Sequence, residues 1–133
     1  MSPASLRSAG ILLILLPTVV FGGVAILTLL IRDPRYRQNP LRQQLWRAGH
    51  AHAGIMLIIS LIALIYVDQT TLTETWRNIV RMAIPAAAIF LPAAFFLSVL
   101  SPTAAKPNIL INLAYVGAIS LTFGLLVLGV GLL

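Results

Sequence analysis

The chain has no cysteine and only three acidic residues among its 133 positions. The absence of cysteine excludes disulfides, thiolate metal sites and cysteine nucleophiles. Charged residues make up 9% of the chain, compared with about a quarter of an average soluble domain. Hydrophobic residues make up 59%, and the mean hydropathy is +1.00. This composition indicates a membrane protein and excludes a soluble enzyme domain.

Four long stretches contain no Lys, Arg, Asp or Glu: residues 8–31, 48–67, 82–105 and 107–133. Each is long enough for a transmembrane helix, since about 20 apolar residues cross the roughly 30 Å hydrocarbon core. The sequence therefore predicts an all-α integral membrane protein, a four-transmembrane-helix bundle that forms a single domain over residues 1–133. We expect spans at about 9–31, 48–67, 80–101 and 108–132. Glycines in the last span, at intervals of seven residues, predict close helix packing, within the bundle or between copies of an oligomer.

Basic residues outnumber acidic ones by nine to three, and the sequence pI is about 11.3. Such a balance can indicate nucleic-acid binding, but five of the arginines lie in or beside one short connection, between the first two spans: Arg32, Arg35, Arg37, Arg42 and Arg47. Short arginine-rich loops remain on the cytoplasmic side and attract anionic lipid headgroups. We therefore expect the lipid bilayer, not nucleic acid, as the partner. The predicted location is a bacterial cytoplasmic membrane, with this loop inside and both termini outside.

The only two histidines, His50 and His52, stand where the arginine-rich segment enters the second span. Titratable side chains at this depth are costly and often mark function. Residues two apart lie about 200° apart around a regular helix, so the two rings cannot both point inward. A chelate within one helix normally uses a spacing of four. Both histidines are candidate metal ligands, either through a distorted first turn or by facing different neighbours, one of which could be a second copy. They could also be interfacial histidines bonded to carbonyls and headgroups.

A second group of polar residues is predicted at the same depth in the last span. Asn108, Asn112 and Tyr115 follow an i, i+4, i+7 spacing, which places them on one face of a helix. We expect them to form a polar pocket near the histidines. The alternative is that they form hydrogen bonds between helices or contact interfacial water.

Residues 22–60 resemble the first two helices of haem-copper oxidase subunit I and its nitric-oxide-reductase relatives. The similarity lies in the glycines of the first helix, Ile31-Arg32 at its end, and a second helix that begins Ala51-His52-Ala53-Gly54-Ile55-Met56. The resemblance implies that His52 is an axial ligand of a low-spin haem b, and that the chain represents one four-helix module. The copper ligands and the other haem ligands of that family have no counterparts here, which excludes copper-dependent oxygen reduction. The candidate cofactor-binding residues are Arg47, Gly49, His50, His52, Gly54 and Met56.

Three functions remain open. The first is a haem- or metal-binding redox or accessory subunit, in which His52 and either His50 or a second copy supply the ligands and arginines pair with the propionates. The second is a non-catalytic structural or assembly subunit that docks to a larger membrane complex through small-residue faces. The third is an oligomer that conducts protons or a small solute along the histidines and the Asn108 face. No carboxylate accompanies the histidines, so an enzyme is the less favoured interpretation.

Overall fold

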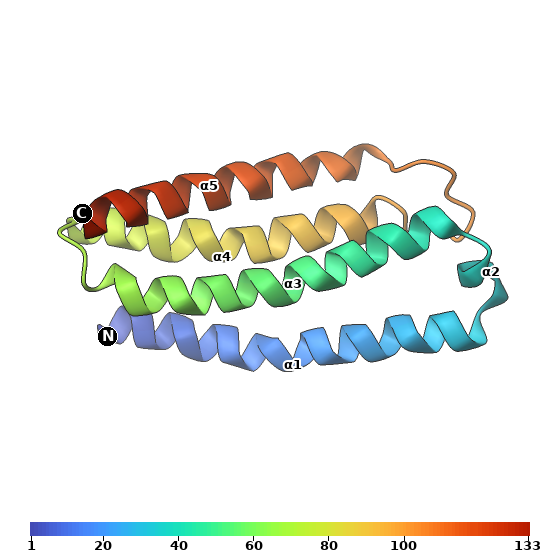
Figure 1. Cartoon of the computed structure of the whole chain (residues 1–133), viewed down its shortest axis with the longest axis horizontal. Helices are drawn as coiled ribbons and strands as arrows, with labels where there is room; N and C mark the ends of the chain where they lie inside the picture. Colours follow the sequence, from blue (N-terminus) through green and yellow to red (C-terminus); the bar gives the residue numbers. More distant parts are fainter.

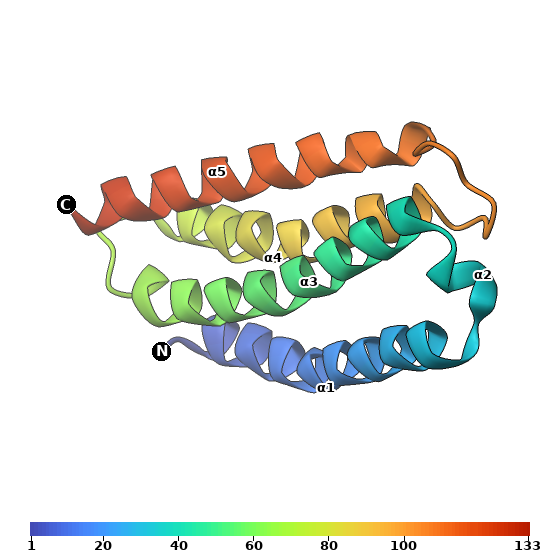
Figure 2. The ribbon, with the colours of Figure 1, turned by 45° about the vertical axis from the view of Figure 1, so that its right-hand side comes forward.

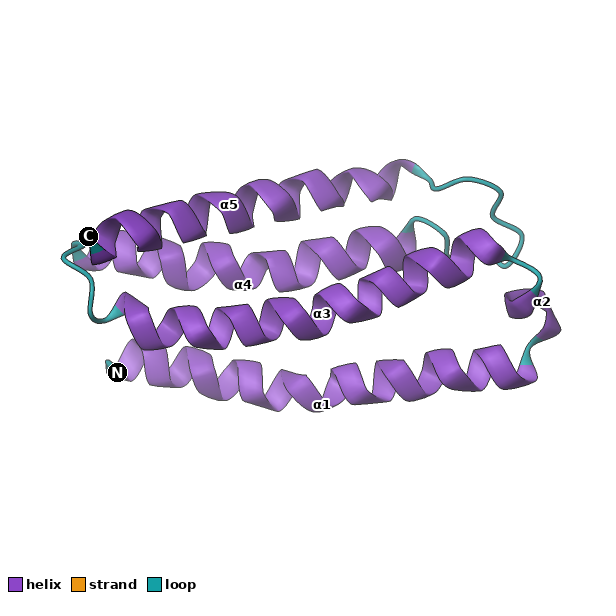
Figure 3. Ribbon diagram, viewed as in Figure 1, coloured by secondary structure: helices purple, strands orange, loops and turns teal.

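The computed structural model describes all 133 residues and contains four long helices joined by short connections (Figure 1). They are α1 (Pro3–Arg32), α3 (Pro40–Val67), α4 (Glu74–Leu97) and α5 (Leu113–Leu132), with the 3₁₀ turn η1 (Ile109–Asn112) directly before α5 and a single helical turn, α2 (Pro34–Arg37), between α1 and α3. There are no strands (Figure 3). All four long helices are long and apolar enough to cross a membrane, as predicted.

A polar residue followed by proline begins three of the helices. In each case the polar side chain accepts a backbone N–H from the first turn, and proline, which lacks an N–H, occupies the first helical position. The pairs are Ser2-Pro3 for α1, Asp33-Pro34 for α2 and Asn39-Pro40 for α3. The cap at Asn39 explains why α3 begins well before residue 48, the expected start of the second span. The arginine-rich segment is therefore partly helical.

The third long helix is shifted toward the N-terminus relative to the expected span at 80–101, because α4 covers Glu74–Leu97. Asn108 caps the C-terminal end of α4. Its side chain donates a hydrogen bond to the carbonyl of Leu97 (3.0 Å), and its backbone N–H donates one to the carbonyl of Ser98 (2.9 Å). These bonds satisfy carbonyls that a helix end otherwise leaves free.

The long helices lie in a row in chain order, α1, α3, α4 and α5, and each packs mainly against its chain neighbours (Figures 1 and 2). The row is open, since α1 packs along its length against α3 alone among the long helices. Only 6% of the most apolar stretch of α1 is buried by the rest of the chain, compared with 39% for α4. The helix α4 is thus the centre of the fold and α1 its exposed edge.

Glycines bring α5 close to α4, as their spacing predicts. A Cβ at Gly117 would lie 2.8 Å from Cγ of Leu91, and one at Gly124 would lie 2.6 Å from Cγ1 of Ile84. Ser120, between them, donates a hydrogen bond to the carbonyl of Ala83 (2.7 Å). Small residues and interhelical hydrogen bonds of this kind are the usual means of helix association in membranes.

Candidate functional site

His50 faces α1, where two glycines make room for its ring. A Cβ at Gly23 would lie 3.0 Å from both Cε1 and Nε2 of His50, and a Cβ at Gly22 would lie 3.7 Å from Nδ1. The imidazole therefore packs directly on the backbone of α1. The space that the glycine pair leaves beside the first helix is filled by this side chain.

His52 faces the other neighbour, α4. Its ring lies 5.1 Å from the ring of Phe95, measured between centroids. Its Nδ1 is 2.8 Å from the carbonyl oxygen of Ala48, one turn earlier in α3. Since a carbonyl only accepts, Nδ1 is the donor in this hydrogen bond.

The structure thus directs the two histidines toward different helices. Nowhere in the chain do three or more His, Cys, Asp or Glu side chains gather in a group that could hold a metal ion. Of the two geometries that the spacing allowed, the one with rings facing different neighbours is found.

The other candidate residues divide between the same two faces of α3. Gly49 is buried against α4, because a Cβ there would meet Phe96 at 3.0 Å and Phe95 at 3.2 Å, and Met56 is buried in a small core cluster with residues of α4. Gly54 faces Val19 of α1. Both glycines therefore serve helix packing in this structure.

Arg47 is exposed and lines a groove of about 360 Å³ between α1 and α3. The groove has His50 and Arg47 on one side and α1 on the other, with lining residues Gly23, Ile26, Leu27 and Leu30. It is apolar along α1 and basic at Arg47. It is thus suited to an elongated molecule with an anionic end.

Asn108 lies before the helical segment, so it does not share a helical face with Asn112 and Tyr115. Asn108 precedes α5 and caps η1, where its side chain accepts the N–H of Leu110 at 2.8 Å. All three residues are exposed, Tyr115 by 70%. They line none of the cavities that contain a histidine.

A polar cluster that the sequence analysis did not identify lies at the opposite end of the molecule, beside the N-terminus. Its centre is Arg81 of α4, whose side chain is 4% exposed. The guanidinium donates to Asp68 (2.6 Å) and Glu74 (2.6 Å), and further to Asn78, Ser2 and Ser5. We call these six residues the N-terminal clasp, because they connect the start of α1 to α4 and to the α3–α4 connection.

The hydrogen bonds of the clasp stabilise the charged form of Asp68. Burial by itself raises the pKa of Asp68, but hydrogen bonds from the Ser2 backbone, Arg81, Ser5 and the Ser2 hydroxyl lower it to about 2. The carboxylate is therefore charged at neutral pH and pairs with Arg81. The signal in the sequence was the position of Arg81, a full two turns inside α4, where a cation needs a partner. Glu74 lies seven positions before Arg81 on the same helix and Asp68 thirteen positions before it, whereas Ser2 and Ser5 reach it from α1, more than 75 positions away.

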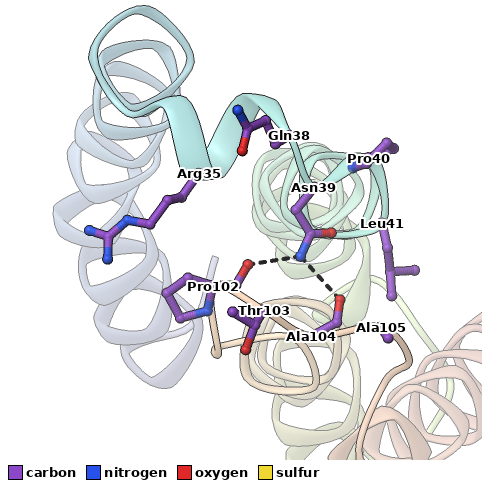
Figure 4. A pocket seen from close by; sticks show the side chains of 9 residues that line it. All are labelled: Arg35, Gln38, Asn39, Pro40, Leu41, Pro102, Thr103, Ala104 and Ala105. Atoms are coloured by element: carbon purple, nitrogen blue, oxygen red, sulfur yellow. Dashed lines mark hydrogen bonds between the residues drawn. The ribbon is translucent and has the colours of Figure 1, made fainter.

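At the arginine-rich end, Asn39 joins the two connections of the chain (Figure 4). Its side-chain amide donates to the carbonyls of Pro102 and Ala104, both at 3.0 Å. Beside it is an open cavity of about 460 Å³, with Arg35 and Gln38 among its lining residues.

Comparison with known proteins gives no match to any family model, to any curated protein or to any solved structure.

Proposed function

We propose that the chain is a non-catalytic accessory subunit of a membrane complex, and that α1 is the helix that docks to the partner. The observation that carries the proposal is the position of α1 at the open edge of the row, where 6% of its most apolar stretch is buried. A helix that packs along its length against α3 and is joined to α4 at the N-terminal clasp leaves much of its circumference free for a second protein.

The histidines and glycines support this interpretation. His50 fastens α1 to α3 through Gly22 and Gly23, and His52 packs on Phe95 of α4. The His50 contact holds α1 against α3, and the His52 contact holds α3 against α4. A fixed orientation lets a single face of α1 be presented to a partner.

Site-specific photo-crosslinking in native membranes tests the proposal. A photoreactive residue at Phe21, which is 73% exposed on α1, should form a crosslink to one partner protein, which mass spectrometry identifies. The same crosslink should be recovered when the affinity tag is placed on the partner instead of on this chain. The matched control is Ile119, 70% exposed on α5 at the other edge of the row, which should crosslink lipid alone. Lipid adducts alone at Phe21 would contradict an accessory role.

A second candidate function is haem binding at His52, which the hydrogen bond to Ala48 favours. A proton fixed on Nδ1 leaves Nε2 free to coordinate a metal, which is the usual arrangement of histidine ligands. A bound haem would supply electron transfer through its iron. In this structure Phe95 and Phe96 fill the space beside Gly49, so a macrocycle there requires both rings to move.

Absorbance spectra of the purified protein, oxidised and reduced, separate the two candidates. Haem binding predicts a Soret band with stoichiometric iron that is lost in His52→Ala and retained in His50→Ala. A preparation that stays colourless and free of iron after haem supplementation would exclude the second candidate and leave the accessory role.

A further inference from the structure

The arginine-rich end of the molecule carries an unbalanced charge. Five arginines and Lys106 belong to this end, and the only acid there is Asp33, which pairs with Arg35 at 3.7 Å. The other two acids, Asp68 and Glu74, belong to the opposite end and bind Arg77 and Arg81. Most of the cations at the arginine-rich end therefore have no carboxylate partner in the chain.

Arg42 is the most unusual of these cations, because it is 93% buried and yet forms no salt bridge. Its Cζ lies 4.1 Å from the centre of the Trp46 ring, and Trp46 is itself held by a hydrogen bond to the carbonyl of Phe96 (3.2 Å). Stacking uses the flat face of the guanidinium and leaves the N–H groups at its edge free. The buried Nε of Arg42 has no hydrogen-bond partner. Leaving a buried donor of a charged group unpaired costs about 1–3 kcal/mol or more.

A second buried polar group without a partner lies next to Arg42. Tyr36 is 1% exposed, its ring lies 5.8 Å from that of Trp46, and its hydroxyl has no hydrogen-bond partner. Burial raises the pKa of Tyr36, while the charges of Arg47 and Arg42 lower it in part. The phenol is thus a neutral hydroxyl donor close to two guanidinium groups.

We propose that Arg42, Tyr36 and Arg47 bind the phosphate of an anionic phospholipid. The three side chains supply two guanidinium groups and one hydroxyl, the donors that recognise phosphate oxygens. Arg47 lines the groove between α1 and α3, whereas Arg42 and Tyr36 are buried and must be uncovered when the phosphate binds. The apolar groove between α1 and α3 begins at Arg47 and continues along Ile26, Leu27 and Leu30, where an acyl chain can lie. The site is at an end of the transmembrane helices, which is the depth of the lipid headgroups. This proposal is independent of any partner protein or haem.

Native mass spectrometry of the full chain, released from detergent, measures the binding. The probes are phosphatidylglycerol, phosphatidylcholine of the same acyl chains, and inorganic phosphate. We expect phosphatidylglycerol to bind most tightly, and both Arg42→Gln and Tyr36→Phe to weaken its binding. Arg42→Gln should weaken it by about tenfold or more, since this substitution removes a charged hydrogen-bonding group. The matched control is Arg35→Gln, which removes an exposed arginine at the same end that lines the separate cavity beside Asn39.

Four results would overturn the proposal. Equal binding of phosphatidylglycerol and phosphatidylcholine would show that the site does not recognise the anionic headgroup. Inorganic phosphate that displaces the lipid at equal concentration would assign the site to a soluble anion. Greater loss in Arg35→Gln would move the headgroup to the other cavity. Unchanged binding in Tyr36→Phe, which removes a single oxygen and keeps the ring packing, would exclude the hydroxyl even if Arg42→Gln failed to fold.

Discussion

Replacing Arg81 by methionine should destabilise the protein more than any change to an exposed arginine. Methionine fills a similar volume but removes all the hydrogen bonds that Arg81 donates in the N-terminal clasp. Asp68 then keeps its charge in a site where its side chain is only 15% exposed. Breaking a buried ion pair by removing one partner costs about 3–5 kcal/mol.

The size of the effect follows from the exposure of the two acids. Glu74 is 59% exposed, so its pair with Arg81 contributes at most about 1 kcal/mol. The partial exposure of Asp68 reduces the cost of its unpaired charge toward the lower limit for buried pairs. We therefore expect Arg81→Met to lower the free energy of unfolding by about 3 kcal/mol. The control Arg7→Met, at an exposed position near the same end of α1, should change it by less than about 0.5 kcal/mol.

Equilibrium unfolding in mixed micelles of a mild detergent and sodium dodecyl sulfate, followed by circular dichroism, measures both variants. The double variant Arg81→Met with Asp68→Asn should be more stable than the sum of the single losses predicts, because it removes the unpaired carboxylate. A loss below about 1 kcal/mol in Arg81→Met, or strict additivity in the double variant, would refute the argument that the clasp is an energetically coupled ion pair.

The same cluster predicts a dependence on pH. The pKa of Asp68 is lowered from 3.8 to about 2, so its contribution of about 2 kcal/mol is complete above the unfolded value and is lost as the pH falls from about 4 to 2. Wild-type stability should decline through this window, and Asp68→Asn should show no such decline attributable to this position. Parallel curves for the two proteins would show that Asp68 is not the group responsible.

The remaining predictions concern glycines. Gly117→Ala should destabilise the protein by about 1–3 kcal/mol, because its Cβ would lie 2.8 Å from Cγ and 3.1 Å from the backbone N of Leu91. The control Gly129→Ala has open space around its Cβ and should be neutral or stabilising by up to about 1 kcal/mol. Equal effects in the same unfolding assay would contradict the packing of α5 on α4. Gly23→Ala should loosen α1, because its Cβ would meet the ring of His50 at 3.0 Å, and the second change His50→Ala should restore most of the loss. A failure of this rescue in thermal unfolding would show that the ring can move aside freely.

The long helices were predictable because their signal is physical and local. Uncharged stretches of twenty or more residues leave few options in a bilayer, and all four candidate spans are present as helices. Their starts were less predictable, since α3 begins at the cap Asn39, well before residue 48, where the second span was expected. The end of α4 depends on Asn108, which is eleven positions away from its acceptor Leu97.

The position of the histidine site was predictable from the sequence, but the helix that each ring faces was not. Helical geometry already required His50 and His52 to diverge, and the structure adds which helix each one meets. The side chains that fill the space beside the glycines, His50 at Gly23 and Phe96 at Gly49, come from neighbouring helices and leave no mark in a single sequence. The N-terminal clasp was missed only partly for the same reason. Ser2 and Ser5 reach Arg81 from α1, more than 75 positions away, but Glu74 and Asp68 lie only 7 and 13 positions from it.

The clasp also constrains the order in which the chain can assemble during synthesis. Ser5 and Arg81 are 76 positions apart, so α1 is synthesised long before the residue that fixes its N-terminal end exists. During that interval the only long helix that α1 can contact is α3, once α3 has been synthesised. The attachment of α1 to α4 is therefore completed only when Arg81 has been synthesised. A chain that stops before residue 81 lacks the hydrogen bonds from Arg81 to Ser2 and Ser5.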